Sequence, residues 1–171
     1  SDCLTGTDRL AEANRQLNCD FIINVQGDEP LISPADINTV AQAYLAGDGS
    51  VVNAMCKIID EREFRSFTVP KVVCDQSNKL LYMSRSAIPL TKNNEFKFSY
   101  KQVCIYAFSK EHLEFFISHQ SKTPLEEIED IEILRFLESQ YPVQMIEVDS
   151  GSMAVDIPED VVRVKAALLN N

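Results

Sequence analysis

Residues 21–30 (FIINVQGDEP) constrain the fold of this chain more than any other stretch. The first half is a near-continuous apolar run, the pattern of a central strand that is covered on both faces. The polarity then changes at once to Asp28 and Glu29, which stand between Gly27 and Pro30. In open α/β sheets the ligand crevice lies beyond the carboxyl ends of the strands, so these acids are candidates for holding a metal or a phosphate ester. An acidic loop without chemistry is the alternative, and the stretch alone does not decide between them.

The composition excludes several classes of protein. With 171 residues, 45% hydrophobic and 25% charged, the chain is long enough for one domain with a sizeable core. A net charge of -10 without a basic cluster argues against nucleic acid as a partner. No run approaches the roughly 20 apolar residues of a membrane span. The five cysteines are scattered and never form C-x-x-C, which indicates reduced thiols in a cytoplasmic protein.

The hydrophobic periodicity and the turn signals predict an α/β fold, a mostly parallel sheet flanked by helices. Strands are expected at 21–25, 51–58, 71–74, 80–83, 99–108 and 143–148, with an antiparallel excursion around 70–108. Helices are expected at about 7–17, 34–46 and 109–118, and from Thr123 and Pro158 onward. In the helix that begins after Thr123, the spacing places Glu129, Glu132 and Arg135 on one side.

Six segments of the chain carry a more specific signal than the periodicity of helices and strands. They are residues 5–12 (TGTDRLAE), 25–30 (VQGDEP), 71–73 with 84–89 (KVV and SRSAIP), 105–106 (IY), 124–135 (PLEEIEDIEILR) and 155–160 (VDIPED). In this order they resemble segments of the 3-deoxy-manno-octulosonate cytidylyltransferases, or CMP-Kdo synthetases. The six ordered matches span the chain and are more specific together than VQGDEP alone. The resemblance implies a Rossmann-like fold of the nucleotide-diphospho-sugar transferase type.

The resemblance also implies a reaction and a set of site residues. A member of this family forms CMP-Kdo and pyrophosphate from CTP and 3-deoxy-manno-octulosonate (Kdo) with Mg²⁺. Asp28 and Asp156 would hold the magnesium and, with Arg85, would be the catalytic residues. The residues that would bind substrate are Thr7, Arg9, Gln26, Gln102, Tyr106 and Glu132.

Each of these assignments has a plainer alternative. Thr7 and Arg9 could be a helix cap and a surface charge, and Arg85 an ordinary exposed arginine. Asp156 could cap the last helix. Glu132 could belong to a solvated face of salt bridges with Glu129 and Arg135. His112 and His119 have no third ligand at metal spacing and are interpreted as surface residues.

The resemblance further implies a cytoplasmic homodimer that supplies lipopolysaccharide or capsule assembly. Family members carry, before the segment that resembles residues 5–12, a first strand and a basic glycine-containing loop that hold the CTP triphosphate. These residues contain no such loop. We therefore expect residues 1–171 to form a single cytidylyltransferase-like domain that is incomplete at its N-terminus.

Three positions depart from the family pattern near the expected sugar pocket. Gln102 and Cys104 stand where the family usually has His and Gly, and Ile133 stands where it often has Gln. Gln102 can donate and accept hydrogen bonds but cannot take a charge. Two alternatives therefore stay open: a CMP-transferase for another ulosonic acid, and a non-catalytic truncated domain that binds sugar or dimerises.

Overall fold

The computed structural model describes residues 3–149, 155 and 158–169. The strands are β1 (Phe21–Val25), β2 (Val51–Lys57), β3 (Lys71–Cys74), β4 (Leu80–Ser84), β5 (Tyr100–Ser109) and β6 (Val143–Glu147). The helices are α1 (Gly6–Leu17), α2 (Pro34–Ala46), α3 (Glu61–Arg65), α4 (Lys110–Ser118), α5 (Pro124–Glu129), α6 (Ile133–Glu138) and α7 (Pro158–Leu169). Every predicted strand is present within two residues of its expected bounds.

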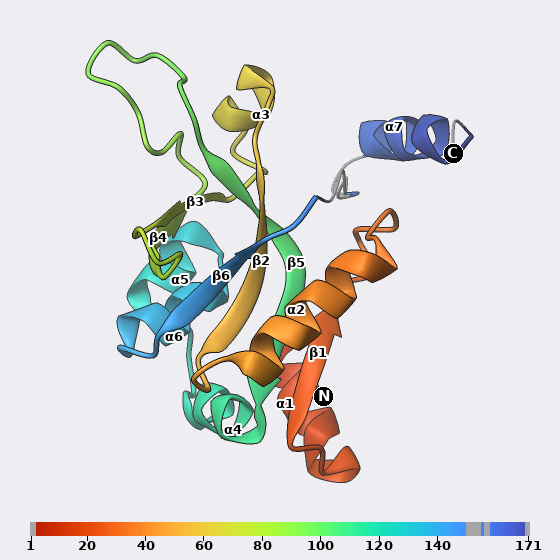
Figure 1. Cartoon of the computed structure of the whole chain (residues 1–171). Coiled ribbons are helices and arrows are strands. Elements are labelled where there is room, and N and C mark those ends of the chain that lie inside the picture. The colour runs from red at the N-terminus through yellow and green to blue at the C-terminus, as the bar shows by residue number, and fades with distance from the viewer. Residues whose placement is uncertain (1–2, 150–154, 156–157, 170–171) are drawn as a thin grey trace.

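The strands form one six-stranded mixed sheet that is organised around β5 (Figure 1). One side of β5 pairs antiparallel with β2, which in turn pairs parallel with β6. The other side pairs antiparallel first with β3, whose second partner is β4, and then with β1. It follows from these pairings that β1, β2, β3 and β6 run in one direction and β4 and β5 in the other. The α/β class, the parallel last strand and the antiparallel excursion are confirmed.

The prediction that β1 is a central strand covered on both faces is wrong for the described chain. Among the described residues, β1 pairs with β5 alone, and its first four residues are only partly buried. The strands with buried side chains on both faces are β5 and β2, and in β2 all residues except Lys57 are buried. An apolar run of this length does not distinguish a central strand from a partly covered one, which explains the error.

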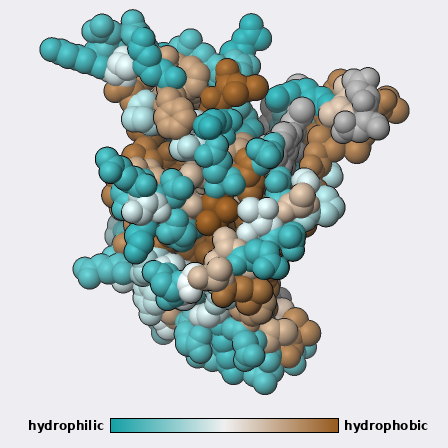
Figure 2. All heavy atoms as spheres, in the orientation of Figure 1, coloured by the Kyte–Doolittle hydropathy of each residue, from teal (hydrophilic) through white to brown (hydrophobic). Residues whose placement is uncertain are grey.

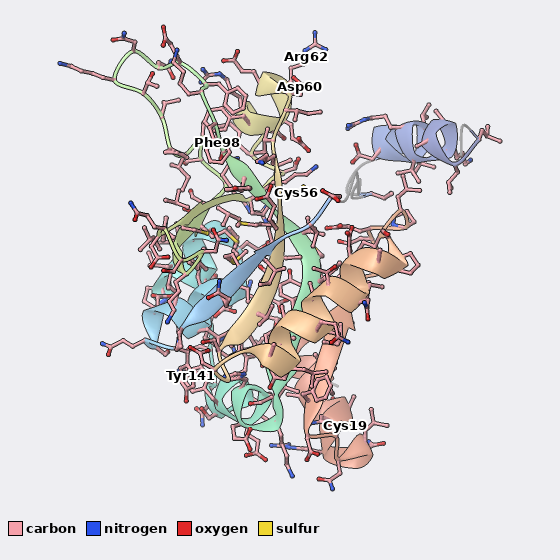
Figure 3. All side chains as sticks on the ribbon, viewed as in Figure 1. Cys19, Cys56, Asp60, Arg62, Phe98 and Tyr141 are labelled. Carbon is pink, nitrogen blue, oxygen red and sulfur yellow. The ribbon has the colours of Figure 1, made fainter. Side chains whose placement is uncertain are left out.

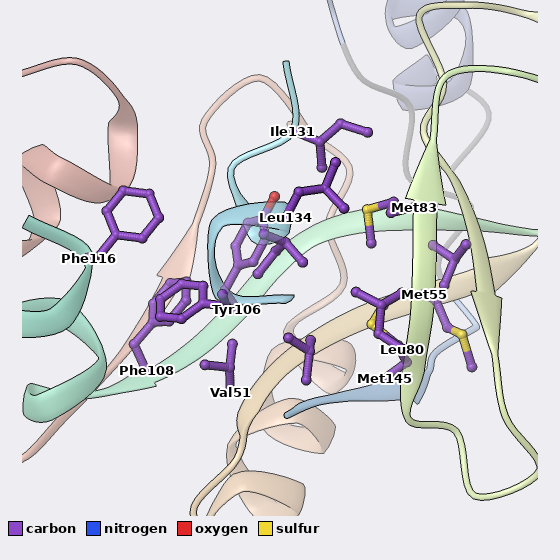
Figure 4. Close-up of a cluster of buried hydrophobic side chains, with 14 of the residues drawn as sticks. Val51, Met55, Leu80, Met83, Tyr106, Phe108, Phe116, Ile131, Leu134 and Met145 are labelled. Carbon is purple, nitrogen blue, oxygen red and sulfur yellow. The ribbon is translucent and has the colours of Figure 1, made fainter. Parts of the chain in front are cut away.

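Helices cover both faces of the sheet. On one face Val40 of α2 packs with the side chains of β2 and β5 that point toward it, including Val103, Ile105 and Ala107. On the other face α4 and α6 bury Phe116, Phe136 and Leu134 against the sheet. Figure 4 shows this second cluster, in which Tyr106 and Phe108 of β5 face Leu134 and Phe116.

The helix predicted to continue from Thr123 past Arg135 is broken in two. Its start is as expected, because Thr123 and Glu126 form a capping box. The helix ends at Glu129, since Asp130 adopts a left-handed conformation with φ 51°, which Asp tolerates better than most residues. Glu129, Glu132 and Arg135 therefore do not share one face.

Arg135 is the clearest departure from the expected solvated face, because its side chain is fully buried. It donates to both carboxylate oxygens of Glu126 at 2.6 Å and to the carbonyl of Phe116 at 2.9 Å. Its Nη1 lies 3.4 Å from Oδ1 of Asp8 on α1. Three helices, α1, α4 and α5, are thus tied to α6 through one side chain.

His112 is also buried, so its interpretation as a surface residue is wrong. The ring Nδ1 of His112 accepts a hydrogen bond from the backbone N–H of Ser109, and the backbone N–H of His112 donates to Ser109 Oγ, both at 3.1 Å. This capping box turns the imidazole back over the helix start, where it packs edge-on against Phe136 and Tyr141. Its capping role places it there. His119 is half-buried against the Phe115 ring.

An arm made of α3 and the segment 85–99 projects from the sheet (Figures 1 and 3). Phe64 packs against Phe96 at 4.6 Å between ring centroids, and Arg65 donates to Asn94, so the two parts hold each other. Figure 2 shows polar side chains at the tip of this arm and apolar side chains nearer the sheet.

No helix in the described part of the chain is long and apolar enough to cross a membrane. The five cysteines, all of which are described, form no disulfide.

Candidate active site

The candidate site lies where two strands succeed each other along the same side of β5. Strand β1 ends with Val25 opposite Ile105, and β3 begins with Lys71 opposite Lys101. Between them, single hydrogen bonds bridge the break, from Gln26 N–H to the Cys104 carbonyl at 3.2 Å and from Gln102 N–H to the Pro70 carbonyl at 3.0 Å. A cavity of about 750 Å³ opens here, a size typical of ligand pockets.

A β-bulge shapes the wall of this cavity. The register between β2 and β5 jumps from Asn53 opposite Tyr106 to Ala54 opposite Val103, so β5 carries two extra residues. Asn53 Nδ2 donates to the carbonyls of Val103 and Ile105, both at 3.0 Å. Glu29 Oε1 accepts from the N–H of Cys104 at 3.0 Å. Hydrogen bonds from two sides thus fix the bulge, a feature often found beside active sites.

Six of the predicted site residues line this one cavity although they come from distant parts of the sequence: Gln26, Asp28, Arg85, Gln102, Tyr106 and Glu132. Thr7 and Arg9 are not among the described residues that line it. Thr7 is buried behind Glu132, and Arg9 is exposed on α1. Asp156 lies outside the described residues.

Glu132 reaches the cavity from the corner between α5 and α6 and is held by the start of α1. Its carboxylate accepts from the N–H groups of Gly6 and Thr7, both at 3.0 Å, and from the Thr7 hydroxyl. The positive end of the α1 dipole further stabilises the negative charge. A carboxylate offers about four acceptor positions, so one remains for a ligand in the cavity.

Arg85 lines the cavity, but its guanidinium binds mainly backbone. It donates to the carbonyls of Glu129 at 2.6 Å, Asp130 at 3.0 Å, and Phe67 and Thr68 at 3.3 Å. These contacts join the end of β4 to the corner before α6 and to the loop before β3. The side chain therefore shapes one wall of the cavity, and its catalytic role stays a prediction.

Lys71 supports the same wall and was not assigned a role from the sequence. Its side chain is fully buried, and Nζ donates to the carbonyls of Ser66 at 2.7 Å, Val69 at 2.6 Å and Arg85. Burial, together with the nearby Arg85 guanidinium, lowers the pKa of Lys71 to about 8. The only sequence signal was its place in the KVV segment, which does not reveal burial.

Cys104 and Tyr106 both titrate well above their ordinary range. Burial is the main cause of the raised pKa of the Cys104 thiol, and the neighbouring Glu29 carboxylate adds to it. Burial likewise raises the pKa of Tyr106. Both groups are therefore neutral at physiological pH, and the Cys104 thiol is not an activated nucleophile.

Several charged residues of the cavity lining form ion pairs. Lys101 pairs with Glu63, Lys122 with Asp130 at 2.7 Å and Arg163 with Asp160 at 3.3 Å.

The Asp28 carboxylate is exposed and makes no hydrogen bond to any residue that the structure describes. Its backbone carbonyl accepts from the N–H of Val155 at 2.8 Å, so the residue that precedes Asp156 lies beside Asp28. Within the described ranges no three acidic, histidine or cysteine side chains are grouped as a metal site.

Comparison with known proteins agrees with the motifs. A profile of the cytidylyltransferase family matches residues 1–149. The chain is 37% identical over 173 residues to the 3-deoxy-manno-octulosonate cytidylyltransferase of Protochlamydia amoebophila, covering 95% of this chain and 66% of that protein. The enzyme of the same name from Syntrophotalea carbinolica is 37% identical over 179 residues, covering 98% of this chain and 71% of the relative. The chain belongs to the 3-deoxy-manno-octulosonate cytidylyltransferase family. It spans about two thirds of the length of these relatives.

Solved structures place the fold in the same family. The structure of CMP:2-keto-3-deoxy-manno-octonic acid synthetase complexed with CTP superposes with a TM-score of 0.88 at 31% identity, covering 99% of this chain and 70% of that one. A putative glucose-1-phosphate thymidylyltransferase from Bacillus anthracis has a TM-score of 0.64 at 15% identity, covering 98% and 62%, and shows the shared fold alone. This chain thus belongs to a family of nucleotidyltransferases and has the nucleotide-diphospho-sugar transferase fold.

Proposed function

We propose that this chain acts in the transfer of a cytidylyl group from CTP to 3-deoxy-manno-octulosonate, which yields CMP-Kdo and pyrophosphate. The observation that carries the proposal is the cavity beside β5, whose lining brings together four of the family-like segments: Gln26 and Asp28 from residues 25–30, Arg85 from 84–89, Tyr106 from 105–106 and Glu132 from 124–135. The names of the relatives supply the substrates. The product would be an activated sugar for lipopolysaccharide or capsule assembly.

In this reaction a hydroxyl of the sugar acid forms a new bond to the α-phosphorus of CTP. The bond between that phosphorus and the bridging oxygen to the β-phosphate breaks, pyrophosphate leaves, and the hydroxyl loses its proton. Glu132, anchored on α1, would accept a hydrogen bond from another sugar hydroxyl and orient the ring. Arg85 would keep the wall rigid while its cationic head remains near the anionic substrates.

Magnesium would be held by Asp28 and Asp156. Carboxylate oxygens are the ligands that Mg²⁺ prefers, and the Asp28 carboxylate is available because no described group bonds to it. The Val155 contact with Asp28 supports the pairing. When bound, the ion would acidify the attacking hydroxyl and offset the charge of the phosphates.

The test is pyrophosphate release from CTP and Kdo with Mg²⁺, measured on this chain and on the complete product of the gene that encodes it. We expect the gene product to turn over and its Asp28→Asn variant to lose at least about 100-fold in rate, as for groups that act in the transition state. Asp75→Asn, in the turn between β3 and β4, is the control and should keep full activity. A folded gene product without turnover of Kdo would contradict the proposal.

A second candidate is transfer to another ulosonic acid, which Gln102 favours. This side chain lines the cavity and cannot take the charge that a histidine at that position could. A panel of ulosonic acids in the same assay separates the two candidates. Turnover of another acid with none of Kdo would select the second candidate, and no turnover of any acid would support a non-catalytic domain.

We also propose a cytoplasmic homodimer. Ile59 and Phe67, which stand just before and just after α3 in the chain, are 91% and 74% exposed, and a second copy of the chain would bury such apolar surface. Sedimentation velocity at micromolar concentration would show a dimer that Phe67→Ser weakens. A monomer at every concentration would contradict this proposal.

A further inference from the structure

The bulge that forms the cavity wall also determines which end of the Gln102 amide can meet a ligand. Asn53 is fully buried at the register shift between β2 and β5. Its amide faces three groups: the carbonyls of Val103 and Ile105, and the side chain of Gln102. The orientation of each amide in this chain of contacts follows from what the carbonyls can do.

Backbone carbonyls only accept hydrogen bonds, so the end of the Asn53 amide that faces them must be its NH₂ group. Nδ2 has two hydrogens, and the two carbonyls at 3.0 Å use both. Oδ1 of Asn53 is then an acceptor that points toward Gln102. Gln102 must meet it with a donor, and Nε2 lies 2.9 Å away. If either amide were reversed, two acceptors or two donors would face each other in a buried site.

The oxygen of Gln102 is therefore turned away from Asn53. Among the described residues it has no hydrogen-bond partner. It is also not buried, since the buried side-chain oxygen without a partner in the described chain is Asp36 Oδ2. Because Gln102 lines the cavity, its carbonyl oxygen is open to a ligand there.

The geometry points to Asn53 as a positioning residue that fixes Gln102 as a hydrogen-bond acceptor for a hydroxyl of the sugar acid. The inference rests on the proposed function for the identity of the ligand, but the amide orientation does not. A hydroxyl can donate to this oxygen, whereas a carboxylate or phosphate has no hydrogen to offer. Gln102 thus selects the polyol part of the substrate and not its acid group.

Nuclear magnetic resonance of the labelled 171-residue chain tests both parts. In the free chain, the side-chain NH₂ of Asn53 should exchange with solvent far more slowly than that of Asn38, which is exposed on α2. On titration with Kdo, the side-chain carbonyl carbon of Gln102 should shift as its oxygen accepts a hydrogen bond. Rapid exchange at Asn53 would overturn the inference. So would an unshifted Gln102 carbonyl while Gln26 and Glu132 respond, and that result would leave the proposed function intact. If no cavity residue responds, the proposed function fails and the ligand part of the inference falls with it.

Affinity for Kdo gives an independent measure. Gln102→Met should weaken binding about fivefold, the value of one neutral hydrogen bond. Asn53→Leu should weaken it by a similar factor, and the double variant no further, because Asn53 acts through Gln102. Gln144→Met is the matched control, since Gln144 is a half-buried strand glutamine outside the cavity lining, and its Nε2 also donates hydrogen bonds within the chain, to the backbone carbonyls of Ser77 and Asn78. Additive losses in the double variant would overturn the positioning role. If Asn53→Leu does not fold, Gln102→Met and the spectra still decide, and unchanged affinity in Gln102→Met would refute the inference.

Discussion

The buried pair of Arg135 and Glu126 gives the most quantitative prediction. Both side chains are fully buried, and two hydrogen bonds of 2.6 Å join them. Arg135→Met keeps much of the apolar volume but leaves the Glu126 carboxylate without its counter-charge. Breaking a buried pair in this way costs about 3–5 kcal/mol. The contact of Arg135 with the Phe116 carbonyl is lost as well, so we expect the upper part of this range.

The loss should depend on the stranded charge. In the double variant Arg135→Met, Glu126→Gln the fully buried carboxylate of Glu126 is gone and only that of Asp8 remains near the site. The cost should therefore be smaller than the sum of the two single variants by at least about 1.5 kcal/mol. The assay is urea unfolding followed by circular dichroism, because the chain has no tryptophan. Lys57→Met, which removes an exposed pair with Glu147, is the control and should cost less than about 1 kcal/mol. Additive losses, or a cost of Arg135→Met no larger than that control, would refute the reasoning.

Three further predictions concern side chains around the site and the fold. Thr7→Val removes a hydroxyl that bonds to the Glu132 carboxylate, so the free energy of unfolding should fall by about 1–2 kcal/mol and Kdo should bind more weakly. Thr39→Val on the exposed face of α2 should change neither quantity appreciably, and an unchanged Thr7→Val would contradict the anchoring of Glu132. Lys71→Met leaves three partly buried carbonyls without their donor and should lower the free energy of unfolding, measured with urea, by at least about 2 kcal/mol, whereas Lys79→Met, at an exposed position, should not. Burial lowers the pKa of His112 and its Nδ1 must stay unprotonated to accept from Ser109, so the unfolded chain binds a proton first. Stability should therefore fall as the pH falls below about 6.5, and His112→Gln should lose that part of the pH dependence; identical slopes in both proteins would contradict it.

Local sequence signals predicted most of the elements of the fold. Ser33 before Pro34 and the Thr123 capping box mark helix starts where the structure has them. In β5 the alternate residues Val103, Ile105 and Ala107 pack in one cluster, as the two-residue period of a strand requires. These signals depend on residues that are close in the sequence, so they can be interpreted without the tertiary structure.

The errors concern residues whose environment is set by distant contacts. Arg135 and His112 were assigned to the surface because they are polar. In the structure helices α1, α4 and α5 enclose Arg135, and the capping box at the start of α4 places His112 in a buried position. The break between α5 and α6 depends on the left-handed conformation of Asp130 alone. Aspartate is also compatible with a continuous helix, so the sequence does not reveal this break.

The cavity brings together Gln26, Asp28 and Glu132, which the motifs indicated, with Gln102, which departs from the family pattern. Their roles in binding and catalysis stay predictions. The residues that support the cavity wall were not predicted. Nothing in the sequence indicated Asn53 or Glu29 as the groups that hold the bulge, because that role depends on a two-residue register shift between β2 and β5. Asp156 lies outside the described residues, so its part in the metal site stays a proposal.

The most direct test of the account is the affinity of the chain for Kdo, measured by calorimetry with Mg²⁺ present and CTP left out, so that no turnover adds heat. The account predicts binding at one site, weakened at least about tenfold by Glu132→Gln, since a hydrogen bond to a charged group contributes roughly 1.5–3 kcal/mol. Glu127→Gln, an exposed acid on α5, should bind as tightly as the unchanged chain. No heat of binding from any of the three proteins, or equal affinity in all three, would contradict the claim that this cavity binds the sugar acid.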